Sequence, residues 1–115
     1  GGRMIEKIIL DYLNENLENV IAYMERPADP EVSYILVEKT GGGESNHIYN
    51  ATIAIQSIAE SMYKAASLNE EIKDLMSGAI SLDGVAKVEL NSDYNFTDTS
   101  TKQYRYQAVF DITHY

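Results

Sequence analysis

The spacing of apolar residues changes several times along the chain, and these changes restrict the fold more than any other feature of the sequence. Near the start and again in the middle, apolar side chains recur at helical spacing with charged side chains opposite them. This pattern predicts amphipathic helices over residues 4–17 and 61–76, with Gly78 ending the second. The two apolar faces consist of Ile5, Ile8, Ile9, Tyr12, Leu13 and Leu17, and of Ala65, Leu68, Ile72, Leu75, Met76 and Ala79.

The segments between and after these helices alternate in polarity or are rich in β-branched residues, which is typical of strands. The expected strands span residues 20–26, 33–39, 47–57, 85–94 and 103–115. Pro27 and Pro30 separate the first two as a turn, because proline cannot donate to a ladder, and residues 95–102 form the tip of a closing hairpin. The order αβββαββ predicts a single α+β domain over residues 4–115, with two helices packed on one face of a largely antiparallel sheet.

The hydrophobic core should form where the two helices meet this sheet. Side chains at alternate positions of a strand share a face, so one face of each closing strand is expected to be apolar. Along the last strand this face carries Tyr104, Tyr106, Ala108, Phe110 and Ile112, and along the preceding strand Ala86, Val88 and Leu90. The expected core joins Ile9, Leu13, Leu68, Ile72 and Leu75 to Val88, Leu90, Phe110 and Ile112.

Three consecutive glycines, Gly41, Gly42 and Gly43, form the most unusual local motif of the chain. A phosphate-binding loop places a lysine after its last glycine, at the start of a helix. Here Lys39 precedes the glycines and Glu44 follows them, where a carboxylate would repel a phosphate. The run is therefore interpreted as a mobile loop that ends one strand and leads to the next.

Catalytic and metal-binding patterns are missing from the sequence. The chain lacks cysteine, which excludes a disulfide, a thiolate metal site and a cysteine nucleophile. His47 and His114 stand in no metal-ligand spacing, and Ser45 beside His47 lacks the elbow motif of a serine nucleophile. The sequence therefore predicts no catalytic residue, no metal and no cofactor.

Length and charge set further limits. With 115 residues, of which 44% are hydrophobic, the chain is long enough for one domain with a modest core. Residues 1–3 are interpreted as a cloning remnant ahead of Met4, and no apolar segment is long enough for a signal peptide or a membrane span. Because the net charge is −9 and the nine basic residues are scattered, neither specific nucleic-acid binding nor membrane binding is expected.

Tyrosine is frequent, with nine in the chain, and several lie in the closing hairpin. Such side chains suit a protein interface, where the ring is buried and the hydroxyl stays wet, but they also suit a half-buried sheet face. The candidate interface residues are Gly41, Gly42, Gly43, Glu44, His47, Tyr94, Phe96, Tyr104 and Tyr106.

Two stretches resemble a known family. They are "ATIAIQSIAESMYKAASLNEEIKDLM", residues 51–76, where a strand leads into a helix, and "YNFTDTSTKQYRYQAVFDI", residues 94–112, in the closing hairpin. Together with the element order, they resemble the tail terminator and head–tail joining family, the small tail-completion proteins of long-tailed bacteriophages. The resemblance covers nearly the whole chain from Met4, and it consists of patterns without a catalytic signature.

The resemblance implies a structural protein with no enzymatic activity, which forms a ring, usually six-fold, at the head-proximal end of the tail tube. Its partners would be further copies of itself, the tail-tube protein and the head connector. DNA would pass through the lumen without specific binding, and assembly would take place in the bacterial cytoplasm before the ring enters the virion. Two alternatives remain: an adaptor that binds a viral or host protein through the tyrosine-rich hairpin, and a small hydrolase that uses the glycine segment.

Overall fold

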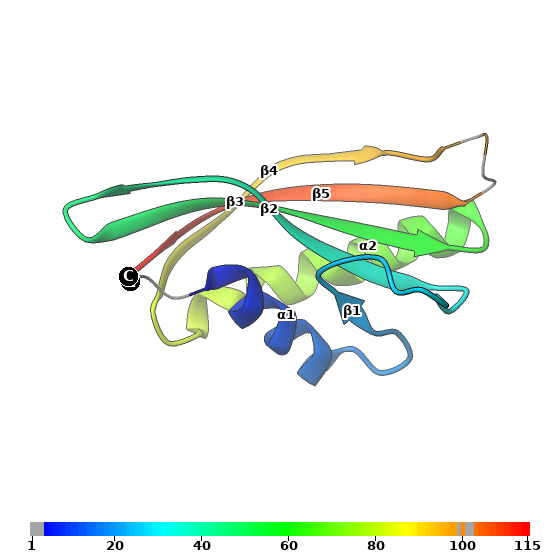
Figure 1. Ribbon diagram of the computed structural model, residues 1–115, viewed down its shortest axis with the longest axis horizontal. Helices are drawn as coiled ribbons and strands as arrows, with labels where there is room; N and C mark the ends of the chain where they lie inside the picture. Colours follow the sequence, from blue (N-terminus) through cyan, green and yellow to red (C-terminus); the bar gives the residue numbers. More distant parts are fainter. Residues whose placement is uncertain (1–3, 99, 101–102) are drawn as a thin grey trace.

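The computed structural model describes residues 4–98, 100 and 103–115, and it shows two helices packed against one face of a five-stranded sheet (Figure 1). The elements are α1 (Ile5–Asn16), β1 (Ala22–Tyr23), β2 (Tyr34–Ser45), β3 (Ile48–Ala59), α2 (Met62–Ser77), the short 3-10 helix η1 (Ala79–Ser81), β4 (Val85–Asn95) and β5 (Tyr104–His114). The predicted order and the α+β class are confirmed. Residues 1–3, interpreted above as a cloning remnant, lie outside the described residues.

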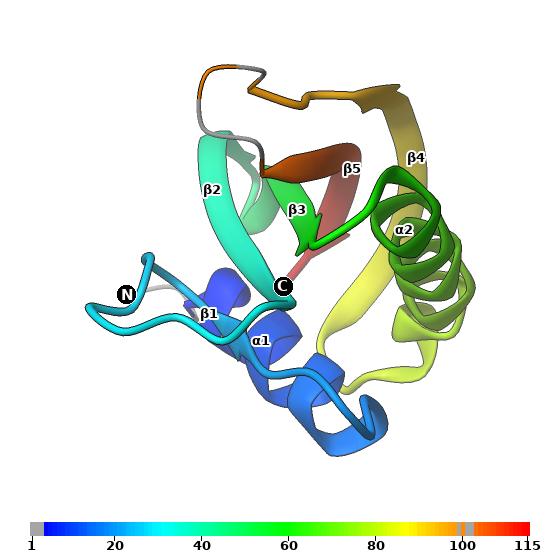
Figure 2. The same ribbon diagram turned by 90° about the vertical axis from the view of Figure 1, so that its right-hand side faces the viewer.

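The strands follow the spatial order β1-β2-β3-β5-β4. Each neighbouring pair among the four long strands is antiparallel, and only β1 runs parallel to its neighbour, β2. Seen along its length, the sheet is twisted, with α1 and α2 gathered on the same side (Figure 2). We call the face that points away from the helices the open face.

The core fills the space between the helices and the sheet. Ile9 and Leu13 of α1 and Ile72 of α2 are fully buried, as their helical spacing predicts. Alternate residues of β3 and β5, including Ile53 and Phe110, point toward these helices because successive side chains of a strand lie on opposite faces. Each large apolar side chain buried in this way contributes about 1.5–3 kcal/mol to stability.

The helix ends have local causes. The Ser61 hydroxyl accepts a hydrogen bond from the backbone N–H of Lys64 at 3.1 Å and so caps the start of α2. At the other end, Gly78 closes the helix as predicted. A Cβ atom at Gly78 would lie 2.9 Å from the Tyr12 hydroxyl, which donates to the Leu75 carbonyl at 2.6 Å. The absent side chain therefore lets α1 approach the end of α2.

The two strands predicted at residues 20–26 and 33–39 differ from expectation in the length of the first and in how the two pair. Of residues 20–26, only Ala22 and Tyr23 form a strand, and this strand, β1, runs parallel to β2. The Asn14 side chain of α1 binds both backbone groups of Ala22, accepting from its N–H at 2.8 Å and donating to its carbonyl at 3.0 Å. This anchor satisfies the backbone of Ala22 from the helix side, so β1 is held by α1 rather than by an antiparallel turn onto β2.

The expected core position of Leu90 is also wrong. Leu90 lies opposite buried Phe110 of β5, yet it is 49% exposed. It belongs to β4, which lies at one margin of the sheet, whereas α2 lies mainly over β3 and β5. Irregularities at Ala86 and Asn91 also interrupt the alternation of β4, so that Val85 is buried while Val88 is only partly buried. Leu75 likewise packs at the margin of the core.

Candidate interface surfaces

The glycine run lies inside a strand and not in a loop, which corrects the prediction of a mobile connection. β2 continues through Gly41, Gly42 and Gly43 to Ser45, and the three glycines pair with Thr52, Ala51 and Asn50 of β3. Thr40 is the one residue of β2 without a register partner, and it marks an irregularity between Lys39 and Gly41. Beyond it, the hairpin stays paired to its tip.

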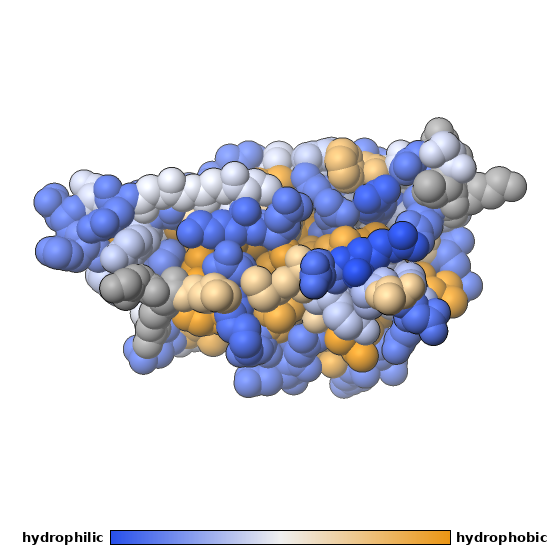
Figure 3. Space-filling view, in the orientation of Figure 1, coloured by the Kyte–Doolittle hydropathy of each residue, from blue (hydrophilic) through white to orange (hydrophobic). Residues whose placement is uncertain are grey.

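The turn falls at Asn46 and His47, which have φ values of 52° and 66°. Two left-handed residues between antiparallel strands are typical of the tight hairpin turn that favours asparagine. We call residues 41–50 the arm. The arm extends past both helices at the left of Figure 1, and all its residues except Tyr49 are exposed. Figure 3 shows mostly hydrophilic and near-neutral residues over the arm, while hydrophobic residues gather between the sheet and the helices.

The three glycines differ in what surrounds them. A Cβ atom at Gly42 would lie 2.9 Å from the backbone carbonyl oxygen of Asn50 and 3.0 Å from Cε of Lys39. At Gly41 and Gly43 a Cβ atom would meet nothing within 4 Å, and neither residue has a positive φ. Close packing within the chain thus accounts for Gly42, but it does not account for Gly41 and Gly43.

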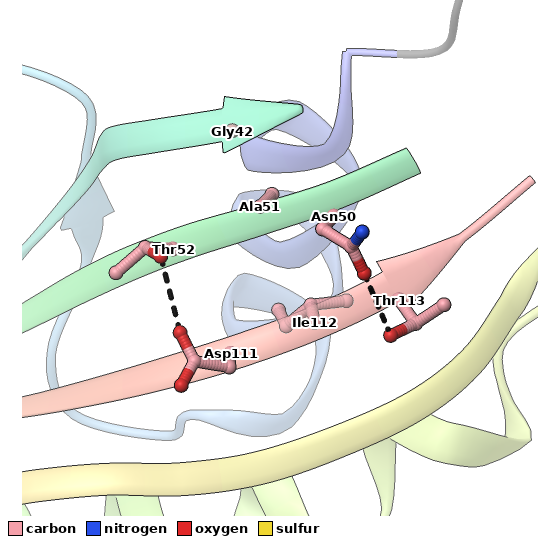
Figure 4. A pocket seen from close by; sticks show the side chains of 7 residues that line it. All are labelled: Gly42, Asn50, Ala51, Thr52, Asp111, Ile112 and Thr113. Carbon is pink, nitrogen blue, oxygen red and sulfur yellow. Dashed lines mark hydrogen bonds between the residues drawn. The ribbon is translucent and has the colours of Figure 1, made fainter. Parts of the chain in front are cut away.

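A hollow of about 350 Å³ lies beside the base of the arm (Figure 4). Its lining residues are Gly42, Asn50, Ala51, Thr52, Asp111, Ile112 and Thr113. The polar side chains bind one another across β3 and β5, because the Thr52 hydroxyl donates to Asp111 at 3.1 Å and the Thr113 hydroxyl donates to Asn50 at 3.2 Å. These polar side chains bind one another, and Gly42, Ala51 and Ile112 complete the lining of the hollow.

The second group of candidates lies on the open face, near the other end of the sheet. Tyr94 and Phe96 meet edge to face with ring centroids 5.9 Å apart, and the Arg105 guanidinium lies 5.5 Å from the centre of the Phe96 ring. Arg105 donates to the Gln56 amide at 3.4 Å, Gln56 donates to Gln107 at 3.1 Å, and Gln107 donates to the Tyr94 hydroxyl. We call these five residues the aromatic cluster.

The aromatic cluster combines a fixed geometry with exposed rings. Tyr94 and Phe96 are 42% and 45% exposed, although their neighbours hold them in place. Exposed aromatic rings beside an arginine are the side chains most enriched at protein interfaces. At the adjoining turn, hydrogen bonds from the Ser100 hydroxyl and backbone N–H lower the pKa of Asp98.

Tyr104 and Tyr106 do not join this cluster. Tyr94 lies opposite Gln107 in the register, so it shares the open face with Gln107 and Arg105. Tyr104 and Tyr106 alternate with those residues along β5 and therefore point to the helix side, where they are partly buried. The nine candidate residues thus lie on three separate surfaces: the arm, the aromatic cluster and the helix side of β5.

The arm and the aromatic cluster lie at opposite ends of an elongated molecule. Ile58 of β3 pairs with Arg105, and Ile48 begins β3 beside the turn. Ten residues separate these positions, which corresponds to about 33 Å of strand. The whole molecule measures 45 × 26 × 25 Å, so the two surfaces can contact different partners at the same time.

An ionic contact fixes β4 against α2. Lys73 and Asn69 of α2 both donate to the Asp93 carboxylate at 2.6 Å, and Lys73 also lies 2.9 Å from Glu70. Burial opposes ionisation of Asp93, but the hydrogen bonds from Lys73 and Asn69 outweigh it, so its pKa lies below the usual value. The hydrogen bond to Asp93, followed by that to Glu70, raises the pKa of Lys73.

Within residues 4–98, 100 and 103–115, no group of three histidine, cysteine or acidic side chains is placed to hold a metal ion. None of the described helices is long and apolar enough to cross a membrane. No protein-family model and no curated protein matches this sequence, so the surfaces of the molecule itself are the basis for inferring what it does.

Proposed function

We propose that this protein is a structural component of a phage or prophage tail, a tail terminator or head–tail joining protein that forms a ring on the tail tube. The observation that carries the proposal is the separation of two chemically different surfaces at opposite ends of one elongated chain. A ring placed between a tube and a head connector needs two such ends, because its two axial faces meet different proteins. The tail-type sequence patterns in residues 51–76 and 94–112 agree with this role.

The two ends differ in chemistry. The arm offers backbone, small side chains and the charged or polar groups of Glu44 and His47. The aromatic cluster offers the rings of Tyr94 and Phe96 with the Arg105 guanidinium between strands β3 and β4. A slender polar projection suits insertion between neighbouring chains, whereas exposed aromatic rings suit a pocket on a partner. One end therefore serves the tube and the other the connector.

The net charge supports passage of DNA without adhesion. Each copy carries −9, so six copies at −9 each carry −54. Lysine and arginine side chains bind the phosphate backbone, whereas carboxylates repel it. A lumen lined by such a chain lets DNA slide, with no specific nucleic-acid binding. In this proposal the protein needs no cofactor, catalyses no reaction, assembles in the bacterial host cytoplasm and ends in the virion.

The experiment adds the purified protein to growing tail tubes made from the tube protein of the same genome. We expect growth to stop and electron microscopy to show the protein as a ring at tube ends. A matched variant, Tyr94→Ser with Phe96→Ser, removes two partly exposed rings together with their contacts to Gln107 and Arg105, and circular dichroism checks that it keeps its fold. This variant should lose binding to one of its two partners, the tube end or the connector.

A specific result of the tube experiment would contradict the proposal. Tubes that keep elongating in the presence of the protein, with none of it at their ends, would overturn the proposal. The adaptor alternative would then gain support if the protein stays monomeric at all concentrations and the Tyr94→Ser, Phe96→Ser variant loses binding to a protein outside the tail. Light scattering across a concentration series distinguishes these states.

A further inference from the structure

Both outer strands of the sheet leave long unpaired edges. Among the described residues, β1 covers β2 only at Ile35 and Leu36, so residues 37–45 of β2 have no strand on their outer side. At the other margin β4 pairs with β5 alone, which leaves its outer edge open over Val85–Asn95. Unpaired edges are templates for adding another strand, and neither edge contains proline to block such pairing.

The directions of the strands make these two edges complementary. The four long strands alternate in direction, so β2 and β4 run opposite ways. When copies follow one another by rotation about an axis along the strands, β2 of one copy meets β4 of the next in the antiparallel sense. Such a contact joins two different surfaces, so each copy can bind a neighbour on both sides, and the chain of copies forms a ring when the rotation between them closes.

Gly41 and Gly43, which have no side chains, leave room for side chains from β4 of the next copy. Through β3 and β5, Gly43 stands level with Lys87 of β4, and Gly41 stands level with Glu89. Lys87 and Glu89 form an exposed ion pair of 2.7 Å along β4. A neighbouring copy at equal height would lay this pair of long side chains over Gly43 and Gly41, the two glycines that packing within the chain does not explain.

We propose that the copies of the ring join edge to edge, with residues 37–45 of β2 pairing antiparallel to β4 of the next copy and the Lys87–Glu89 pair covering Gly41 and Gly43. This inference rests on the proposed function for its biological setting and names the interface between copies. It predicts one continuous sheet around the ring, with the turn at Asn46 and His47 and the aromatic cluster left free on the two axial faces.

The chain lacks cysteine, so introduced cysteines report this contact without background. The test variant combines Gly43→Cys with Lys87→Cys, and a second one combines Gly41→Cys with Glu89→Cys. Gly41 and Gly43 have room for a Cβ atom, and Lys87 and Glu89 are exposed, so these chains should fold. Directly opposed residues of neighbouring strands lie within disulfide range. Mild oxidation at tube ends should therefore give a ladder of crosslinked species up to the complete ring.

Four sets of controls define the contact. Gly43→Cys alone or Lys87→Cys alone should give no dimer, whereas a mixture of the two single variants should give dimers only. Gly43→Cys with Tyr63→Cys, which places the second thiol on exposed α2, should crosslink less by on the order of tenfold, because its effective concentration is lower. Cysteine pairs in which the β4 position is shifted by two residues test whether β2 and β4 pair in a different register.

The outcomes separate this inference from the proposed function. A complete β2–β4 ladder at high concentration, with tubes that still elongate, supports the edge contact and overturns the tail role. Rings visible at tube ends without crosslinks in any register support the tail role and overturn the edge contact. Dimers from Lys87→Cys alone show that β4 pairs with itself, which also overturns it. If no crosslinks form at tube ends or at the highest soluble concentration, the edge contact is likewise overturned.

Discussion

At the scale of single residues, coverage by α2 decides how much an apolar side chain contributes. Phe110 and Leu90 lie opposite each other in β5 and β4, yet Phe110 is 3% exposed and Leu90 is 49% exposed. Phe110 and Leu90 share one face of the sheet, so they form a matched pair of apolar side chains that differ mainly in burial.

Truncation should reveal this difference. We expect Phe110→Ala to lower the free energy of unfolding by about 3–5 kcal/mol and Ile72→Ala by about 2–5 kcal/mol, because each leaves a cavity in the core. Leu90→Ala should cost about 1 kcal/mol or less, since a side chain that is half exposed buries less apolar area and leaves little cavity. Urea unfolding followed by circular dichroism measures all three. Equal losses at Phe110 and Leu90 would contradict the position of α2.

At the scale of elements, the arm allows a comparison of three adjacent glycines. Gly42→Ala should destabilise the chain by about 1–3 kcal/mol, because the new methyl group would press on the Asn50 carbonyl. Gly41→Ala and Gly43→Ala should stabilise it by about 0.5–1 kcal/mol, because each has open space and restricts the unfolded chain. Thermal unfolding of the monomer at low concentration provides the measurement. A loss at all three positions would show that residues 41–45 are not a regular strand.

The contact between β4 and α2 should depend on pH. Asp93→Asn should lower stability at neutral pH by about 0.5–1 kcal/mol, since the ion pair with Lys73 is partly exposed. The pKa of Asp93 is lowered, so its contribution is complete above the ordinary value of 3.8 and is lost as the pH falls through the folded value. The pKa of Lys73 is raised, so the contribution persists up to the alkaline range above 10.5.

Thermal unfolding at a series of pH values tests this contact. The difference in melting temperature between Asp93→Asn and the unaltered chain should be constant from about pH 5 to 8 and should narrow below about pH 4. Glu89→Gln serves as the control, because that side chain is exposed and pairs only with Lys87 among the contacts described here. A difference that stays the same at pH 3 would mean that Asp93 acts without its charge.

The elements that the sequence predicted well are those whose pattern is local. The apolar spacing predicted both helices, and the position of Gly78 after the last apolar turn predicted the end of the second. The strand through Gly41–Gly43 did not follow, because pairing with β3 overrides the weak strand preference of glycine. A signal for the true turn was present in Asn46, a residue favoured at left-handed positions, three residues beyond the glycines.

At the scale of the whole molecule, the sequence predicted the class and the order of elements, but not the placement of the candidate residues. The separation of the arm from the aromatic cluster depends on the length of the β2–β3 hairpin, and the separation of Tyr94 from Tyr104 depends on strand register. Register is set by contacts between distant segments, which a single sequence does not display.

The two open strand edges carry a hazard for the isolated chain. Until a neighbour covers them, every copy exposes rows of backbone N–H and C=O groups that any extended peptide can join, which is how fibrils and inclusion bodies begin. Mutual repulsion between copies that each carry −9 slows such encounters. The acidity of the chain thereby acts as colloidal protection during the interval between synthesis and incorporation.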